Sequence, residues 1–429
     1  MKRWLLRSLA VFAFGVLAVL ILPFGCVERG AAGEGADDDS DDDIARTEAI
    51  NPIIAEGKRC LAAGDGVCAW DAFSEALVID PDSTDANFGL VLADQLLISE
   101  LGRQIIYMIS IFGNPSQKSF GGGYHTLEFG SFLQGIVNEV LGGKSSEMIP
   151  ALEVCLEDDG FRFDLENYPI VWNGEVLDEV CCEWDSADAT LLKAPALLLD
   201  ATVVSLLSHN LDFDLALLLE LDLSGTPLEI IGRIIDIAIE ILTDPDYPDF
   251  LLLADDGAER LQQAGIDLGF AFLAIPYGFA MVRAETDDQS DDIAAYVDTN
   301  GNGAYDEGEP YRLPVFGELT PEQSALIPLI EELCVKVAAS LLDGTEYDLD
   351  PNSPNPFHLS DLNDLLVALG ILPSPILPPI PVDLGKPFRE PTPDGLKNLL
   401  IQIFTWLDEI FPAADKGQSY EPADRRDAV

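Results

Sequence analysis

Residues 298–309 (Asp-Thr-Asn-Gly-Asn-Gly-Ala-Tyr-Asp-Glu-Gly-Glu) constrain the fold more than any other stretch of this chain. Side chains that carry oxygen recur at positions 1, 3, 5, 9 and 12 of the stretch, and Gly303 stands at position 6, where the chain needs a sharp turn. Calcium takes about six to eight oxygen ligands, so a short loop holds it only when oxygens recur at this spacing. The stretch therefore predicts a Ca²⁺ site whose ligands are Asp298, Asn300, Asn302, the carbonyl of Ala304, Asp306 and Glu309.

The loop resembles the calcium loop of the EF-hand family at every liganding position. Its surroundings differ from that family, because Pro310 and Pro314 prevent a helix from leaving the loop before about Thr320. The resemblance implies an isolated loop of the kind found in secreted bacterial proteins, with a dissociation constant of about 10⁻⁴–10⁻³ M. We assign residues 285–319 to this acidic, calcium-binding segment and expect it to act as a structural clamp. The alternative is a solvated Asn/Gly turn that binds no ion.

The N-terminus has the features of an export signal. A basic start, Met1 to Arg7, precedes an apolar run from Leu9 to Phe24, which is shorter than the roughly twenty residues of a spanning helix. Residues 22–26, Leu-Pro-Phe-Gly-Cys, resemble the bacterial lipobox, although Pro23 replaces its usual aliphatic residue. The resemblance implies a signal peptide over 1–26, lipidation of Cys26 and anchoring at the bacterial cell envelope, facing the periplasm or the cell surface. Ordinary cleavage after Ala32 and an uncleaved anchor are the alternatives.

The charge balance is strongly acidic, with 76 Asp and Glu against 23 Lys and Arg and a net charge of −53. This balance argues against a nucleic-acid partner, which needs a basic surface. A hydrophobic content of 48% argues against global disorder. Residues 27–45 contain an acidic run, and we expect them to form a disordered tether between the anchor and the folded chain.

Residues 46 to about 96 resemble a tetratricopeptide repeat, and we assign 46–115 to this helical region. The small, aromatic and helix-ending positions of that repeat are matched by Gly57, Ala69, Phe73, Ala76 and Pro81. Departures occur at Ile53 and Cys60, where that family has aromatic residues. The resemblance implies an antiparallel helical hairpin, with Phe73 packed between the helices, that binds a protein partner. A hairpin used only as a scaffold is the alternative.

The rest of the chain also reads as helical. We expect a helical body over 116–284, with helices at 226–242 and 257–284, the second interrupted at Pro276. In the C-terminal part, 320–412, we expect helices from Thr320 to Leu342, Ser360 to Gly370 and Leu396 to Phe411, with a Pro-rich surface strap over 373–391 and a loose tail over 413–429. The predicted fold class is therefore mainly α: a helical hairpin followed by a larger helical body with an inserted calcium loop.

Seven cysteines are present, and six remain once Cys26 is set aside for lipidation. An even number suits disulfides in an oxidising envelope. Cys60 and Cys68 flank the hairpin turn, so we expect them to pair. The other four have open pairings, and zinc is the rival interpretation, although Cys-x-x-Cys spacing is absent. The disulfide candidates are Cys60, Cys68, Cys155, Cys181, Cys182 and Cys334.

No catalytic motif surrounds the three histidines, His125, His209 and His358. We therefore predict no catalytic residues, and we expect an envelope lipoprotein that serves as a structural or protein-binding module rather than an enzyme. Two alternatives stay open. One is a calcium-stabilised extracytoplasmic hydrolase, and the other is a carrier of apolar ligands, suggested by the Leu-rich segment 191–242.

Overall fold

The computed structural model describes a part of the chain that begins at Ser40 and ends at Ile410. The described residues are 40–112, 142–158, 160–172, 175–211, 227–285, 294–313, 317–349, 357–368, 374–375 and 377–410. The predicted signal peptide, residues 27–39 of the predicted tether and the tail 413–429 lie outside them. Within the described part the fold is mainly α, as predicted, and it also contains two small sheets that were not predicted.

The N-terminal hairpin consists of α2 (Ser40–Ala62) and α3 (Gly66–Ile79), followed by α4 (Thr84–Phe112). Phe73 is fully buried, and its ring lies so close to the α-carbons of Gly57 and Gly89 that a Cβ at either position would stand within 3 Å of it. The predicted helices and the position of Phe73 between them are confirmed. The helix α2 begins at Ser40, inside the segment 27–45 that was predicted to be a disordered tether. Its sequence starts Ser-Asp-Asp-Asp, and acidic residues in the first turn stabilise a helix through its dipole.

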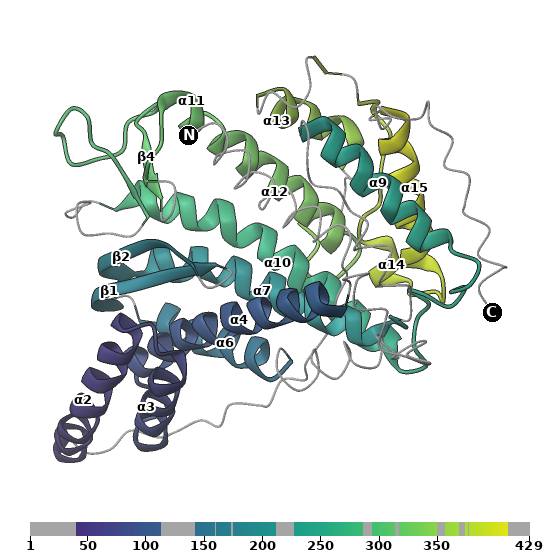
Figure 1. Cartoon of the computed structure of the whole chain (residues 1–429). Coiled ribbons are helices and arrows are strands. Elements are labelled where there is room, and N and C mark those ends of the chain that lie inside the picture. Colours follow the sequence, from purple (N-terminus) through teal and green to yellow (C-terminus); the bar gives the residue numbers. More distant parts are fainter. Residues whose placement is uncertain are drawn as a thin grey trace.

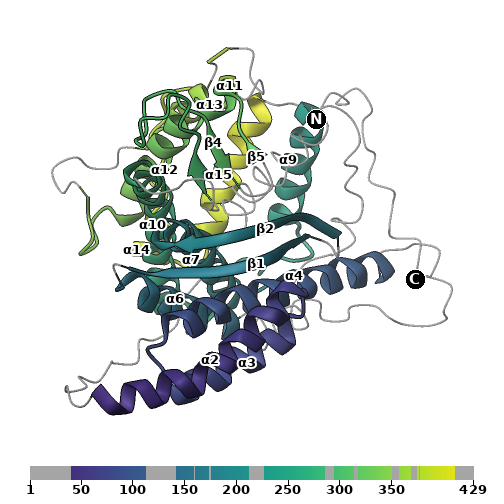
Figure 2. The same cartoon turned by 90° about the vertical axis from the view of Figure 1, so that its left-hand side faces the viewer.

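A β-hairpin follows where the sequence interpretation placed only helices. After α6 (Gly142–Leu156), strands β1 (Arg162–Trp172) and β2 (Glu175–Asp185) pair antiparallel. In β1, Phe163 and Leu165 are buried whereas Asp164 is exposed, which is the alternation of a half-buried strand. The prediction of an all-helical body over 116–284 is therefore wrong over this hairpin. Figure 2 shows both strands running across the molecule near α4 and α6.

Three long helices form the centre of the molecule: α7 (Ser186–Ser208), α10 (Gly257–Ala284) and α12 (Ile327–Leu342). The helix α10 packs against both α7 and α12 (Figure 1). The helix α10 continues through Pro276, so the predicted interruption is wrong. A proline removes one helical hydrogen bond, and the packing of α10 against α7 and α12 outweighs that loss. By length and composition α7 and α10 are apolar enough to cross a membrane, and in the structure they pack on each other.

Apart from α11 (Pro321–Ser324), which lies toward the opposite end of α10, the C-terminal elements surround one end of that helix (Figure 1). Their apolar side chains form one core with those of α7, α10 and α12. The helix starts predicted near Thr226, Thr320 and Leu396 are confirmed. At the second of them, Thr320 and Gln323 form a capping box. The elements are α9 (Pro227–Thr243), α11 (Pro321–Ser324), the 3₁₀ turn η3 (Leu359–Leu362), α13 (Asn363–Ala368), α14 (Lys386–Arg389) and α15 (Gly395–Ile410).

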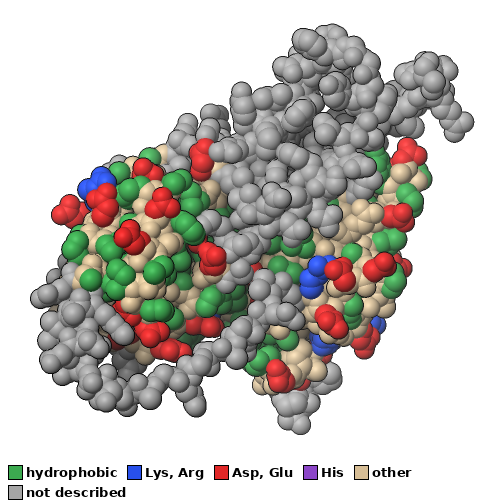
Figure 3. All heavy atoms as spheres, turned by 90° about the horizontal axis from the view of Figure 1, so that it is seen from below, with side chains coloured by type: hydrophobic (Ala, Val, Ile, Leu, Met, Phe, Trp, Pro, Cys, Tyr) green, Lys and Arg blue, Asp and Glu red, His purple; other side chains and the backbone are tan. Residues whose placement is uncertain are grey.

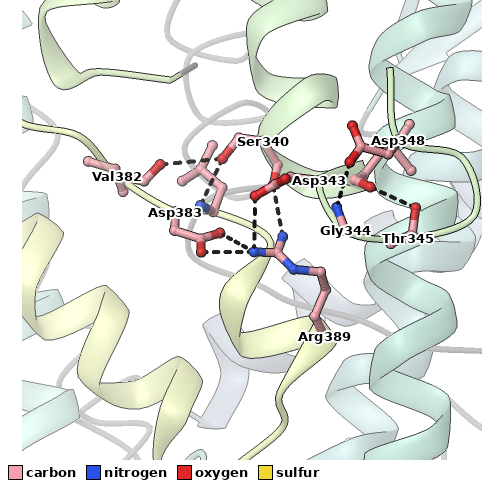
Figure 4. A network of polar contacts seen from close by, with 10 residues as sticks. Ser340, Asp343, Gly344, Thr345, Asp348, Val382, Asp383 and Arg389 are labelled. Carbon is pink, nitrogen blue, oxygen red and sulfur yellow. Dashed lines mark hydrogen bonds and ion pairs between the residues drawn. The ribbon is translucent and has the colours of Figure 1, made fainter. Parts of the chain in front are cut away.

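The Pro-rich segment packs into this core through its apolar side chains, with exposed residues such as Pro379 and Pro381 between them, so it does not lie wholly on the surface. Leu377, Val382, Leu384 and Phe388 are all buried, and the short helix α14 lies within the segment. Figure 4 shows how Arg389 fastens it: Nη2 donates to both oxygens of Asp383 at 2.9 and 2.8 Å, and Nη1 donates to the carbonyl of Ser340 at 3.1 Å near the end of α12. The apolar side chains of the segment explain why the prediction of a surface position is wrong.

The surface reflects the charge of the sequence. On the face drawn in Figure 3, acidic side chains are spread among apolar ones, and basic side chains are sparse.

Candidate metal centre

The predicted calcium loop connects two strands of a small sheet. Strand β3 (Ala295–Tyr296) pairs with β4 (Tyr311–Leu313), which pairs in turn with β5 (Gly317–Glu318). The N–H of Val297 donates to the carbonyl of Pro310 at 2.8 Å, so the two ends of residues 298–309 are held together. The absence of a helix directly after the loop is confirmed. The loop is thus the tip of a β-hairpin and lies on one side of α10 and α12, near β4 in Figure 1.

Asp298, at position 1, organises the first half of the loop. Its Oδ1 accepts backbone N–H groups of Asn300, Gly301 and Asn302 at 3.2, 2.6 and 3.3 Å, and its Oδ2 accepts that of Gly303 at 2.7 Å. The bond from Gly303, followed by those from the other three residues, holds the pKa of Asp298 below its usual value. Gly303 has φ of +75°, a conformation that other residues adopt at a cost, which explains glycine at position 6.

Positions 3, 5 and 9 face one another. The amide nitrogens of Asn300 and Asn302 both donate to Oδ2 of Asp306, at 2.6 and 2.7 Å. A half-turn of either amide would present its oxygen in place of its nitrogen, because the two ends of an amide are nearly equal in shape. Two amides and one carboxylate of the predicted ligand set are therefore gathered at one place.

Glu309, at position 12, turns inward and is only 5% exposed. Its Oε1 accepts the N–H and the hydroxyl of Thr299 at 2.8 and 2.9 Å, and its Oε2 accepts the N–H of Asp306 at 3.0 Å. Burying a carboxylate is costly unless hydrogen bonds compensate. Glu309 thus joins the start of the loop to its end through a carboxylate held at the base.

The donor set fits a hard divalent cation, since it consists of oxygens alone, with three carboxylates among them. The predicted ligands lie in one loop, but their oxygens do not surround a single point. Within the described part of the chain, one group of acidic, Cys or His ligand atoms lies mutually within 4.8 Å, and it is Glu56, Cys60 and Cys68 rather than the loop. Asp298, Asp306 and Glu309 would therefore have to move toward one another to share an ion.

Aromatic side chains under the loop anchor it to the helices. The Tyr305 ring, from position 8, lies 5.7 Å from that of Tyr296 and 5.6 Å from that of Tyr311, and Tyr311 lies 5.4 Å from Phe279 of α10. These rings belong to a separate apolar cluster that also includes residues of α7 and α12. Sequence reasoning missed this anchor, although the run of consecutive apolar residues at 293–297 is a signal for it.

Two polar side chains, Arg283 and Asp188, reinforce the anchor. Arg283 of α10 donates to the hydroxyl of Tyr311 at 3.1 Å and to both carboxylate oxygens of Glu331 of α12 at 3.1 and 2.7 Å. Burial raises the pKa of Tyr311, and the hydrogen bond to Glu331 raises that of Arg283. On the other side, Oδ1 of the buried Asp188 in α7 accepts the N–H of Ala294 at 3.0 Å. The hairpin is thus fixed to all three central helices.

The cysteines separate into three groups. Cys60 and Cys68 form the predicted disulfide across the turn between α2 and α3. Cys155 in α6 and Cys334 in α12 are free, buried thiols, which corrects the expectation of disulfides at these positions. Burial raises the pKa of both thiols to about 12. Cys26 and the side chains of Cys181 and Cys182 lie outside the described part.

The two histidines within the described residues make structural contacts. His209 is buried, with Nδ1 2.6 Å from the carbonyl of Ser205, and burial lowers its pKa. His358 begins η3, and its N–H donates to Asp361 at 2.7 Å. His125 lies outside the described residues.

Between α10, α12, α14 and α15 lies an apolar cavity of about 40 Å³, far smaller than the roughly 300 Å³ at which ligand pockets begin.

Comparisons with models of protein families, with curated proteins and with solved structures found no match.

Proposed function

We propose that this chain is an exported, lipid-anchored protein of the bacterial cell envelope, and that calcium stabilises it as a structural or protein-binding module. The observation that carries the proposal is the loop at 298–309, which holds the side chains of Asp298, Asn300, Asn302, Asp306 and Glu309 on a hairpin fixed to three helices. The sequence of the N-terminus, with its apolar run and Cys26, supports export and lipidation.

Calcium would be held by those five side chains and by the carbonyl of Ala304. The ion supplies positive charge that compensates three carboxylates brought close together. Because β3 and β4 pack on α10 and α12, an ion that joins Asp298 to Glu309 favours the folded arrangement of the whole hairpin. Its role is that of a clamp, since binding to the folded state alone stabilises that state by mass action.

Exposed apolar side chains on the helical hairpin support the proposal of a protein partner. Val67 and Val78 of α3 are 61% and 85% exposed. They lie about three helical turns apart, so both fall on the same side of the helix. A partner that covers this side would bury two apolar side chains, whereas the opposite side of α3 already packs on α2 and α4. A hairpin that serves only as a scaffold is the alternative.

Within the residues that the structure describes, neither alternative function has a specific observation in its favour. A hydrolase would need a group of catalytic side chains, and the histidines within the described residues bind backbone groups instead. A carrier of apolar ligands would need a far larger cavity than the one between α10 and α15.

Terbium luminescence tests the calcium site. Tb³⁺ takes the same oxygen ligands as Ca²⁺, and Tyr305 within the loop would sensitise its emission. We expect emission on excitation of tyrosine, displacement by Ca²⁺ but not by equal Mg²⁺, and loss in the Glu309→Gln variant. Glu318→Gln, on the exposed strand β5, is the matched control and should leave the emission unchanged. Emission that survives Glu309→Gln would contradict the proposal.

Metabolic labelling with a radioactive fatty acid in a Gram-negative host tests the anchor. The full chain should incorporate label and sediment with membranes, and Cys26→Ser should lose both properties. Cys334→Ser, which changes a buried thiol, should retain both. Equal labelling of the Cys26→Ser variant would rule out lipidation at that residue.

A further inference from the structure

A second group of ligand atoms lies at the turn of the N-terminal hairpin. Glu56 and Cys60 are four residues apart on α2, so they share one side of that helix, and Cys68 faces them from the first turn of α3. One carboxylate oxygen of Glu56 and both sulfurs lie within 4.8 Å of one another. The distance between Cys60 Sγ and Glu56 Oε1 is 3.9 Å.

The two sulfurs are joined in the oxidised chain, and a disulfide offers no thiolate to a metal. Reduction by a dithiol breaks the S–S bond: two electrons and two protons pass to the protein, which gains two thiols, while the dithiol becomes a disulfide. The reduced hairpin then presents two thiols and one carboxylate from rigid helices packed around Phe73. This donor set differs from the all-oxygen set of the calcium loop.

We propose that Cys60, Cys68 and Glu56 form a binding site for a thiophilic divalent cation of the zinc class when the disulfide is reduced. Binding converts both thiols to thiolates, so each ion bound releases two protons and the fourth position goes to water. In a tetrahedral zinc site with Zn–S of about 2.3 Å and Zn–O of about 2.0 Å, the donor atoms lie roughly 3.5–3.8 Å apart. The separation of 3.9 Å between Cys60 Sγ and Glu56 Oε1 is already close to this value.

Arg59 is the group that the cation must replace. Its Nε and Nη2 donate to the Glu56 carboxylate at 2.8 and 2.5 Å, and Nη2 lies 3.5 Å from Cys60 Sγ. The Arg59 side chain is 64% exposed, so it can turn into solvent at little cost, because exposed ion pairs contribute little to stability. The disulfide and the metal exclude each other, and either one joins α2 to α3.

Cobalt titration of the full chain, reduced with a phosphine, tests the site. Thiolate-to-Co²⁺ charge-transfer absorption should appear, and Zn²⁺ should abolish it. The absorption should be lost in the Cys60→Ser/Cys68→Ser variant and weakened about tenfold or more in affinity by Glu56→Gln. Glu75→Gln, exposed on α3, is the matched control, and Arg59→Gln should bind at least as tightly as the wild type. The site is refuted if Glu56→Gln binds Co²⁺ like the wild type, or if the double serine variant keeps the absorption.

A second measurement needs no substitution. Zn²⁺ should slow alkylation of Cys60 and Cys68 in the reduced full chain by about tenfold or more, as mapped by mass spectrometry of peptides. The oxidised chain should show neither alkylation at these residues nor cobalt charge transfer from them. Alkylation of both cysteines at the same rate with and without Zn²⁺ would overturn the proposal, whatever the variants do.

Discussion

Arg283 donates hydrogen bonds to both carboxylate oxygens of Glu331, at 3.1 and 2.7 Å, and so joins α10 to α12 behind the hairpin that carries the loop 298–309. The same guanidinium donates to the hydroxyl of Tyr311, which belongs to β4. One side chain therefore connects two central helices and the strand that leaves the loop. The hairpin is held by this connection, by the rings around Tyr305 and by Asp188.

Replacing Arg283 by Met should destabilise the protein. The change removes three hydrogen bonds and leaves Glu331, whose side chain is only 14% exposed, without its cation. We expect a loss of about 1–3 kcal/mol in the free energy of unfolding, measured in urea. The Arg283→Met/Glu331→Met variant should lose less than the sum of the two single variants, because the pair is coupled. Additive losses would show that the pair contributes nothing of its own.

Gly89→Ala should destabilise the hairpin although alanine favours helices. An added Cβ would lie 2.3 Å from the ring of Phe73, which is fully buried and cannot move away freely. Overpacking of this kind costs about 1–3 kcal/mol, against a helix-propensity gain of roughly 0.5–1 kcal/mol. Thermal unfolding measures the balance. Phe73→Leu in the Gly89→Ala background should restore part of the loss, and a Gly89→Ala variant more stable than wild type would contradict the packing.

Stability should fall with acid through His209. Burial lowers the pKa of His209, so between that lowered value and about 6.5 the unfolded chain binds more protons than the folded chain. The stabilising contribution is complete above about pH 6.5 and is lost as the pH falls through the folded pKa. We expect the urea midpoint to decline from pH 7.5 to 5, and His209→Gln to flatten that decline. An unchanged pH dependence in the variant would assign the effect to other groups.

Calcium should stabilise the folded chain. With a dissociation constant of about 10⁻⁴–10⁻³ M, 10 mM calcium should add about 1.4–2.7 kcal/mol to the free energy of unfolding. Denaturation with urea at matched ionic strength measures this, with magnesium as the control ion. A gain of equal size from magnesium would point to general screening of the acidic surface rather than to the loop.

Elements with local signals were predictable from the sequence. The turn around Gly64, the start of α9 and the helix start at Thr320 each depend on a few neighbouring residues, and the structure has them where expected. Strands β1 and β2 also carried a local signal, since Asn173-Gly174 between alternating residues is typical of a hairpin, and this signal was overlooked. The bounds of α10 were predicted, but its continuity through Pro276 depends on packing against α7 and α12.

Contacts between distant segments were not predictable. The loop's ligand spacing is local, whereas its anchor brings together Asp188, Phe279, Arg283 and Glu331 from three helices. Nothing in one sequence indicates that Arg283 reaches both Tyr311 and Glu331. Likewise, nothing local indicates that Arg389 binds the carbonyl of Ser340 at the end of α12 while it pairs with Asp383.

Calorimetric titration of the full chain with calcium measures binding at residues 298–309, with the wild type compared with Asp298→Ala/Glu309→Ala. We expect saturable binding of about one ion to the wild type, with a dissociation constant of about 10⁻⁴–10⁻³ M, and no saturable binding to the variant. Circular dichroism should show that both proteins are helical. Absence of binding heat in the wild type, or equal binding by the folded variant, would contradict a calcium site at residues 298–309.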